Sequence, residues 1–341
     1  MKQITLGNTG IKTPQNAFGA LPIQRVTMDE AVRILQRAYE GGMTFFDTAR
    51  AYSDSEKKLG VAFEGMRDKI FIASKTMAKT PDEFWKQLDT TLNNLKTDYL
   101  DIYQLHCVPQ CYQPNDGTGM YECMAKAKEQ GIIKHIGVTA HNIETAFQCV
   151  NSGLYETMQF PFSYLCSERE IELVNLCREK NVGFIAMKGL AGGLIHNSTA
   201  AMAYISKYDN VLPIWGIQKI SELEEWLKFM KEEPVWNDEI RTYIEKERKE
   251  LVGDFCRGCG YCMPCPKEIK INNCARMSLM LRRAPSKAWL TEDMQKEMMK
   301  IEDCINCGQC KSKCPYKLDT PNLLRKNLED YKKVLAGEVS V

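Results

Sequence analysis

Two short runs of cysteines in the C-terminal part of this chain constrain its fold more than any other feature. The second run consists of Cys304, Cys307, Cys310 and Cys314, followed by Pro315. Its C-x₂-C-x₂-C-x₃-C-P spacing is that of a bacterial-type [4Fe–4S] ligand run. Three closely spaced thiolates can hold three corners of one cubane, while the fourth cysteine ligates the other cluster of a pair. The spacing therefore predicts a domain that binds two clusters.

The first run departs from this spacing, because only two residues separate its last cysteine from the one before. That departure leaves the fourth ligand of the first cluster open. Crossed ligation is the prediction that follows, with each run giving three thiolates to one cluster and one to the other. The two predicted ligand sets are Cys256, Cys259, Cys262 and Cys314 for one cluster, and Cys304, Cys307, Cys310 and Cys265 for the other.

Structural zinc is the alternative occupant of such cysteines. Zinc favours tetrahedral Cys₄ sites built from separated C-x₂₋₄-C pairs. Triplets followed by Cys-Pro favour iron–sulfur clusters instead. The other cysteines are scattered, and we expect each to be a small hydrophobic residue. They are Cys107, Cys111, Cys123, Cys149, Cys166, Cys177 and Cys274.

Composition limits the environment and the partners of this chain. The 45 basic and 44 acidic residues leave a formal charge of +1, so no overall field attracts nucleic acid or an anionic membrane. The N-terminal segment has no apolar signal region, and the cysteine total of 15 is odd. We therefore expect a cytoplasmic protein with reduced thiols, whose partners are small molecules or other proteins, including a redox partner protein.

Upstream of the cysteine runs, short β-like segments alternate with amphipathic helical segments such as 28–41 and 81–95. Eight such units in one run predict a (β/α)₈ TIM barrel over residues 1–232. A helical linker over 233–255 and a mainly helical, ferredoxin-like cluster domain over 256–341 are predicted to follow. The expected barrel strands are 17–21, 44–48, 70–74, 100–106, 133–139, 157–160, 182–187 and 211–215.

Four polar residues fall at or just after the ends of barrel strands in the first half of the chain. Each has an ordinary explanation of its own, as a cap, a solvated end or a packed ring. Because barrel active sites form at the C-terminal ends of the strands, together they predict a proton-transfer site. They are Asp47, Tyr52, Lys75 and His106.

The segments around these four residues resemble the aldo/keto reductase family. Phe-Phe-Asp47-Thr-Ala-Arg-Ala-Tyr52 is similar to its Asp…Tyr segment, Ile-Ala-Ser-Lys75 to its lysine strand, and Asp-Ile-Tyr-Gln-Leu-His106 to its histidine strand. A barrel followed by a dicluster module resembles an iron–sulfur subgroup of that family. The resemblance implies carbonyl reduction by hydride from NADPH or NADH, on a small-molecule carbonyl or alcohol substrate.

The resemblance also implies a role for each residue. Tyr52 would be the proton donor, and Lys75 would lower its pKa from the usual value of about 10 by favouring phenolate. Asp47 would hold Lys75 in place as a charged group. His106 would orient the substrate carbonyl.

Coenzyme binding is expected at the loops after the seventh and eighth strands, where barrels of this type bind phosphate. Ala140, Met187 and Trp226 depart from the family's usual residues, and the sequence does not separate NADP from NAD. The expected coenzyme residues are Thr139, Gln159, Met187, Lys188, Gly189, Gly192, Gly193, Gly216 and Lys219.

A different class of function remains open at this point. In it, the chain is an iron–sulfur electron-transfer protein whose barrel serves only as a docking body. The complete set of four catalytic residues favours the enzyme. The substrate, the structural or redox role of the clusters, and the oligomeric state are not determined by the sequence, although Trp215 and the loop 106–120 are expected to line the substrate pocket.

Overall fold

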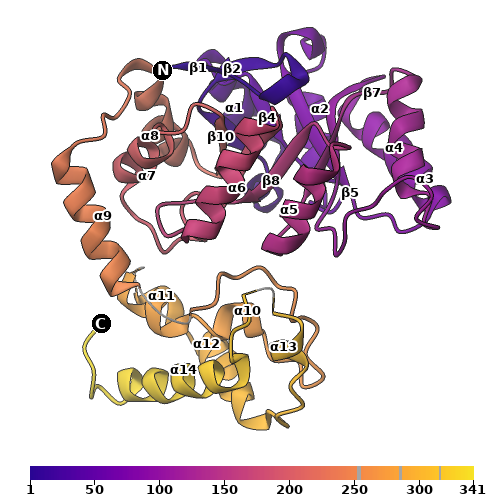
Figure 1. Cartoon of the computed structure of the whole chain (residues 1–341). Coiled ribbons are helices and arrows are strands. Elements are labelled where there is room, and N and C mark those ends of the chain that lie inside the picture. The colour runs from indigo at the N-terminus through magenta and orange to yellow at the C-terminus, as the bar shows by residue number, and fades with distance from the viewer. Residues whose placement is uncertain (252–254, 284–285, 315) are drawn as a thin grey trace. The chain divides into compact units, whose positions relative to one another are not determined.

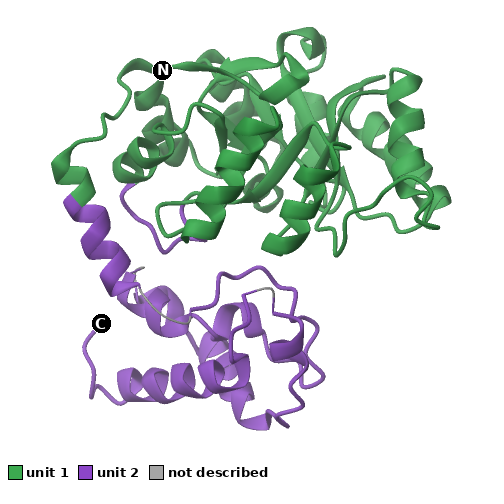
Figure 2. Ribbon diagram, in the orientation of Figure 1, with its two compact units in different colours: residues 1–189, 198–241 green, residues 190–197, 242–341 purple. Residues whose placement is uncertain are grey.

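The computed structural model describes residues 1–251, 255–283, 286–314 and 316–341. By its internal contacts the chain divides into two compact units, one of residues 1–189 and 198–241 and the other of residues 190–197 and 242–341 (Figure 2). Pro315, which completes the second cysteine run, lies outside the described residues. The predicted domain boundaries after residues 232 and 255 remain predictions.

A closed barrel of eight parallel strands forms the centre of the first unit (Figure 1). The strands follow one another around the barrel in chain order, and the last pairs with the first. This arrangement confirms the predicted (β/α)₈ fold. The strands are β3 (Ala17–Gly19), β4 (Phe45–Asp47), β5 (Phe71–Thr76), β6 (Leu100–Leu105), β7 (Ile133–Thr139), β8 (Thr157–Pro161), β9 (Gly183–Met187) and β10 (Val211–Gly216).

An antiparallel hairpin, β1 (Gln3–Thr5) and β2 (Lys12–Pro14), precedes the barrel. Its Ile4, Leu6 and Ile11 belong to one buried apolar cluster with residues of the barrel strands, among them Ala17 and Phe45, which begin β3 and β4. Leu6 packs so closely on Gly183 that a Cβ at Gly183 would lie 2.5 Å from the Leu6 Cγ. One end of the barrel is therefore filled with apolar side chains, which leaves the C-terminal end for a polar site.

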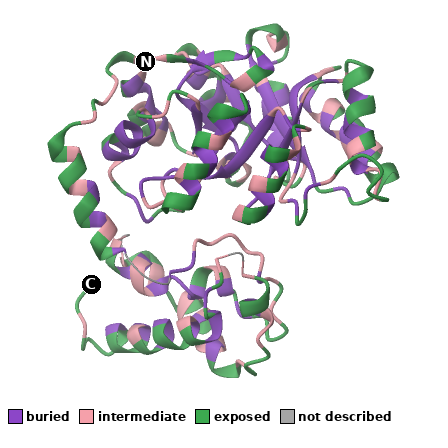
Figure 3. Ribbon diagram, in the orientation of Figure 1, coloured by how far each residue is buried: buried purple, intermediate pink, exposed green. Residues whose placement is uncertain are grey.

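The barrel helices begin where the sequence offers capping groups. The Thr80 hydroxyl accepts a hydrogen bond from the Glu83 N–H, and Pro81 takes the first helical position. In Figure 3 the barrel strands are mostly buried, whereas the helices alternate between buried and exposed residues. The α-helices are α1 (Met28–Glu40), α2 (Ser55–Ala62), α3 (Pro81–Leu95), α4 (Met120–Glu129), α5 (Ile143–Ser152), α6 (Glu168–Glu179), α7 (Ser198–Ile205) and α8 (Ile220–Lys231), with 3₁₀ turns η1 (Gly7–Thr9), η2 (Pro22–Arg25) and η3 (Arg67–Lys69).

The second unit is mainly helical, which agrees with the predicted ferredoxin-like region. Its longest helix carries a buried stripe of Leu324, Leu328 and Tyr331 at helical spacing, and the Tyr331 hydroxyl donates to the Trp289 carbonyl. No helix in the described part of the chain is long and apolar enough to cross a membrane. Its helices are α9 (Asp238–Glu250), α10 (Ile271–Cys274), α11 (Met277–Arg283), α12 (Glu292–Met299), α13 (Gln309–Ser312) and α14 (Thr320–Leu335), with 3₁₀ turns η4 (Ser286–Trp289) and η5 (Lys300–Asp303).

A loop from the middle of the chain also belongs to this second unit. Residues 190–197 connect β9 to α7, yet their contacts group them with residues 242–341. The buried Arg276 donates to the Gly192 carbonyl at 2.5 Å, and Arg283 donates to the Leu194 carbonyl at 3.0 Å. Arg283 is itself paired with Glu247 on α9. Two arginines far along the chain therefore fix this loop.

Candidate active site

A buried ion pair lies at the C-terminal end of the barrel. Lys75, near the end of β5, places its Nζ 2.6 Å from Asp47 Oδ1 at the end of β4. The same Nζ donates to the Thr48 carbonyl at 2.7 Å, and both side chains are almost fully inaccessible to solvent. A charged pair is stable in such a place only if each charge is compensated, and these contacts supply the compensation.

Tyr52 and His106 lie next to this pair. The Lys75 Nζ is 5.1 Å from the centre of the Tyr52 ring, which meets the His106 ring edge to face at 5.9 Å. The Tyr52 ring comes from the loop between β4 and α2, and His106 directly follows β6. The structure therefore brings together the four residues predicted to be catalytic.

Burial and charge set the protonation states of this group. Burial lowers the pKa of the Lys75 ammonium, but the charges of Asp47 and Tyr52 outweigh it, and the net pKa is raised. Burial together with the charge of Lys75 lowers the pKa of His106 to about 3. Lys75 is therefore charged at neutral pH, while His106 is a neutral imidazole.

The pKa of Tyr52 differs from the expectation drawn from the sequence. Lys75 does lower it, as predicted, but burial of the phenol and the charge of Asp47 raise it, and burial is the largest effect. The net pKa of Tyr52 is raised above its usual value of about 10. The predicted net decrease is wrong, because the sequence does not reveal how deeply the phenol is buried.

Two glutamines on the inner wall of the barrel extend the polar group. Gln104 on β6 donates to Gln159 Oε1 at 2.9 Å and to Asp47 Oδ2 at 3.4 Å. Gln159, a predicted coenzyme residue, is paired in register with Thr139. Gln104 was not predicted from the sequence. Its position as a polar residue within an otherwise mostly apolar strand could have indicated it.

Cys107 and His141 also belong to this end of the barrel. Cys107 has a left-handed backbone, with φ of 55°, and its N–H donates to Thr139 Oγ1 at 2.7 Å. Its Sγ lies 3.9 Å from the His141 Nδ1. Cys107 is partly exposed, and its expected part as a small hydrophobic residue remains a prediction. Cys166 is also only partly buried, whereas Cys111, Cys123, Cys149, Cys177 and Cys274 are buried as expected.

A buried carboxylate anchors the loop that carries Tyr52. Glu56 on α2 is inaccessible to solvent and accepts hydrogen bonds from Ser74 and Thr91, both at 2.8 Å. It also forms an ion pair with Arg50, two residues before Tyr52. The loop is therefore tied to β5 and α3 beneath it.

The predicted coenzyme residues are distributed over both compact units. In the first unit, Met187 and Lys188 are partly exposed, whereas Gly189 is buried. The exposed Gly216 ends β10, and Lys219 precedes α8, where the Glu222 carboxylate accepts the N–H groups of Gln218 and Lys219. Gly192 and Gly193 lie in the second unit, both with positive φ. Their common role in coenzyme binding remains a prediction.

Two buried tryptophans, on β10 and α8, stack against each other. Trp215 and Trp226 stack with ring centres 3.8 Å apart, and both are buried. A Cβ at Gly189 would lie 2.5 Å from the Trp215 ring, so Gly189 is required by close packing. Trp215 was expected to line the substrate pocket, and this role remains a prediction.

Comparison with known proteins identifies the family. Residues 4–200, more than half of the chain, match the model of the aldo/keto reductase family. The chain belongs to this family. This aldo/keto reductase family member also carries a 4Fe–4S dicluster domain, because residues 255–319 match the model of that domain.

Individual relatives of this family member are distant. It is 25% identical over 212 residues to a probable aldo-keto reductase 1 of Glycine max, covering 57% of this chain and 60% of the relative. It is 27% identical over 209 residues to the L-galactose dehydrogenase of Arabidopsis thaliana, covering 56% of this chain and 66% of the relative. The chain thus spans less than two thirds of the length of these curated relatives.

Solved structures of the family share the fold. An aldo-keto reductase from Klebsiella pneumoniae in complex with NADPH superimposes with a TM-score of 0.61 at 21% identity, covering 72% of this chain and 95% of that one.

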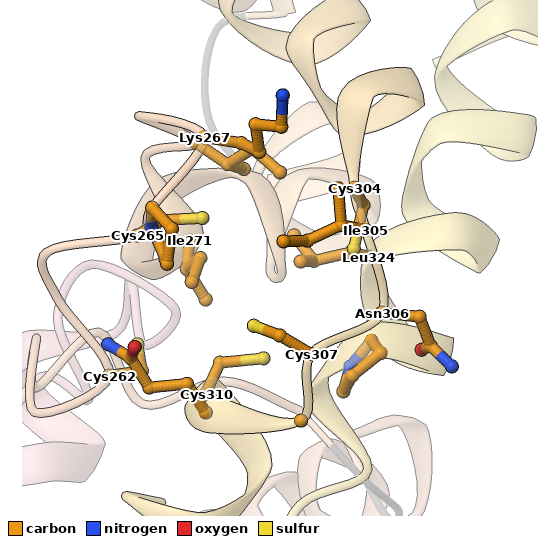
Figure 4. Close-up of a pocket in the computed structure, with 15 residues that line it drawn as sticks. Cys262, Cys265, Lys267, Ile271, Cys304, Ile305, Asn306, Cys307, Cys310 and Leu324 are labelled. Carbon is orange, nitrogen blue, oxygen red and sulfur yellow. The ribbon is translucent and has the colours of Figure 1, made fainter.

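The cysteines of the dicluster domain surround two separate cavities. Cys265, Cys304, Cys307 and Cys310 line one cavity, and Figure 4 shows several of their thiols facing a common space. Cys256, Cys259, Cys262 and Cys314 line the other. Cys262 also borders the first cavity, so it lies between the two.

Proposed function

We propose that this protein reduces an aldehyde or ketone with NADPH or NADH at the C-terminal end of the barrel, and that its C-terminal unit holds two [4Fe–4S] clusters. The observation that carries the first part is the buried ion pair of Lys75 and Asp47 beside Tyr52 and a neutral His106. Family membership adds support, because oxidoreductases of this family share the barrel.

Each residue of the group has a distinct task in this proposal. Tyr52 protonates the carbonyl oxygen as negative charge develops on it, since its phenol is protonated at neutral pH. Lys75 stabilises the phenolate that is left behind, and Asp47 keeps the ammonium charged and oriented. The neutral His106 can donate a hydrogen bond to the same oxygen without repelling Lys75.

The reduced nicotinamide, when bound, supplies the hydride that the carbonyl carbon receives. Thr139 and Gln159 are suited to hold its carboxamide, because both are polar side chains and are paired in register, Thr139 at the end of β7 and Gln159 within β8. The NADPH bound to the family member from Klebsiella pneumoniae supports NADP as the first coenzyme to test. The further coenzyme residues proposed are Met187, Lys188, Gly189, Gly192, Gly193, Gly216 and Lys219.

The two cysteine-lined cavities support two clusters with crossed ligation. One cavity is lined by Cys304, Cys307 and Cys310 of the second run together with Cys265 and Cys262 of the first. The other is lined by three cysteines of the first run and by Cys314 of the second. Among the described residues, no three His, Cys, Asp or Glu side chains are placed to hold a single metal ion. Zinc requires four ligands about 2.3 Å from one point, whereas a cubane needs thiolates spread around a larger body. The geometry therefore favours clusters over zinc.

Replacing Tyr52 by Phe tests the proposed reaction. We expect the rate of carbonyl reduction to fall by about 10²-fold or more, because only the proton donor is lost. Coenzyme affinity should change less than about twofold, since the phenol is not among the proposed coenzyme ligands. The measurement is anaerobic oxidation of NADPH and NADH with a panel of aldehydes and ketones, together with a coenzyme titration.

Tyr39→Phe provides the matched control, because Tyr39 on α1 packs against Phe63 away from Lys75. This variant should keep full activity. Turnover by the Tyr52 variant at the wild-type rate would exclude Tyr52 as the proton donor. Failure of the wild-type protein to oxidise either coenzyme with any carbonyl would favour the electron-transfer alternative.

A further inference from the structure

A charged groove opens next to the proposed active site. It is an open surface groove between the loop that follows β4 and the first turns of α3. Its walls include Arg50, Met77, Lys79, Glu83, Lys86 and Gln87. The residues from α3 recur at helical spacing, so one face of the helix forms one wall.

The groove is attached to the strand ends that carry the catalytic residues. The Arg50 N–H donates to the Lys75 carbonyl at 3.0 Å, and Tyr52 follows two residues later. On the other side, Gln87 Oε1 accepts from the Thr76 hydroxyl at 2.8 Å and from the Met77 N–H at 3.2 Å. The groove therefore has a fixed position relative to Tyr52 and Lys75.

Positive charge predominates in the groove. Lys79 and Lys86 are exposed, and among the described residues neither amine forms an ion pair. Glu83 is the acidic side chain in the lining, and its carboxylate accepts the Lys79 N–H at 3.0 Å. Arg50 is held by Glu56 and the Ser53 carbonyl. The N-terminal end of α3 adds the positive end of its dipole.

Apolar surface accompanies the charge. Met77 is 51% exposed, which is unusual for a long apolar side chain that is two residues from a buried catalytic lysine. A ligand that fits both features has a short carbon chain and an anionic end.

We propose that this groove binds the carboxylate or phosphate group of an acidic carbonyl substrate, with Lys79 and Lys86 contacting the anion and Met77 contacting the carbon chain. The inference rests on the proposed carbonyl reduction at Tyr52 and names the substrate class of that site. The anion belongs to the substrate and not to the coenzyme, because the proposed coenzyme residues follow or end β7, β8, β9 and β10, whereas the groove follows β4 and β5.

The test compares acids with neutral analogues of the same length. Oxo-carboxylic acids of four to six carbons, each with a terminal aldehyde, are assayed beside their methyl esters in the wild type and in Lys79→Gln/Lys86→Gln. We expect the wild type to favour at least one acid over its ester by about tenfold in kcat/KM, the size expected of two exposed charge contacts. The double variant should lose this preference, and added salt should reduce it in the wild type.

Lys69→Gln/Lys180→Gln is the matched control. It removes the same charge from exposed positions before β5 and β9, at the opposite end of the barrel. This control should keep the preference for the acid. Equal loss in both double variants would show an effect of net charge alone and would overturn the groove proposal.

Three further measurements separate the outcomes. Calorimetric titration of the coenzyme-loaded protein with the oxo-carboxylic acids should show weaker binding in Lys79→Gln/Lys86→Gln than in the wild type. This measurement tests the groove even if no carbonyl is reduced. Coenzyme affinity should be the same in both double variants, and its loss only in the Lys79/Lys86 variant would assign the groove to the coenzyme and overturn the proposal.

Comparison of kcat/KM for glyceraldehyde 3-phosphate and for glyceraldehyde distinguishes a phosphate from a carboxylate ligand. The groove proposal would be refuted if kcat/KM were equal for every acid and its ester, and also for glyceraldehyde 3-phosphate and glyceraldehyde. If Tyr52→Phe were inactive in the same assays, the proposed function would still stand.

Discussion

Lys75 carries its charge in one of the least accessible positions of the barrel, at 1% exposure. Removing one member of a buried ion pair leaves the other charge uncompensated, which costs more than the pair contributes. Stability and catalysis therefore both depend on this residue, and separating them requires the removal of both charges.

Lys75→Met should be destabilised by about 3 to 5 kcal/mol, because it leaves the Asp47 carboxylate buried alone. The double variant Asp47→Asn/Lys75→Met should recover most of this stability but remain inactive, since nothing stabilises the Tyr52 phenolate. Urea denaturation and the coenzyme oxidation assay measure the two effects. Recovery of activity in the double variant would show that Lys75 acts only in folding.

The low pKa of His106 predicts that its imidazole does not titrate near neutral pH. Burial is the larger cause and the charge of Lys75 the smaller, and together they lower this pKa to about 3. The imidazole should therefore stay neutral between pH 5 and 8. Burial likewise lowers the pKa of His141 well below its usual value. Imidazole NMR signals of both residues should not shift in this range, although histidine in the urea-unfolded chain should titrate near about 6.5. A shift of the His106 signal near pH 6 would contradict this reasoning.

Residue types at strand ends were sufficient to predict that Asp47, Tyr52, Lys75 and His106 meet. The local sequence could not reveal that Cys107 faces His141, because that contact joins the ends of two strands through a left-handed turn. Nor could it give the sign of the Tyr52 pKa shift, because burial is a property of the assembled barrel.

Among the elements, β7, β8 and β9 are joined by one acidic residue. Glu156 accepts hydrogen bonds from His135 Nδ1 at 2.7 Å, from the Ile136 N–H at 2.9 Å and from Lys128 at 2.6 Å. Its own carbonyl accepts the Gly183 N–H at 2.9 Å. Burial raises the pKa of the carboxyl, but these hydrogen bonds outweigh burial and lower the pKa to about 2.

Because its pKa is lowered in the folded state, ionised Glu156 stabilises the folded protein, and this contribution is lost at acidic pH. Its contribution should be complete above the unfolded pKa of about 4.3 and should be lost as pH falls towards 2. Glu156→Gln should therefore be about 1 to 2 kcal/mol less stable than the wild type at pH 7, with the difference shrinking below pH 4. Urea midpoints measured by circular dichroism at several pH values give this difference. The exposed Glu179→Gln serves as control, and a difference for Glu156→Gln that is independent of pH would contradict the assignment.

The strands were predictable because apolar runs bounded by turns recur eight times, and observed ends differ from expected ends by at most two residues. Loops were less predictable. The glycines of residues 188–193 suggested one continuous barrel loop, but the contacts that place residues 190–197 with the second unit come from Arg276 and Arg283, far along the chain.

For the whole molecule, the two cysteine-lined cavities predict about eight iron atoms per anaerobically prepared chain. Cys265→Ala should damage the cluster of Cys304, Cys307 and Cys310, and Cys314→Ala the other cluster, because each run completes the opposite site. Iron analysis with paramagnetic resonance should show one damaged cluster in each variant. Cys274→Ala, which changes a buried cysteine outside both sets, should keep both clusters, and stoichiometric zinc without iron would refute the prediction.

The chain contributes to its C-terminal unit twice, first with residues 190–197 and again after residue 241. A chain cut after residue 232 keeps the Gly192 and Leu194 carbonyls but loses the arginines that donate to them. Expression of the barrel by itself would therefore leave this loop without two of its hydrogen-bond donors, so the full chain is the proper starting point for work on either part.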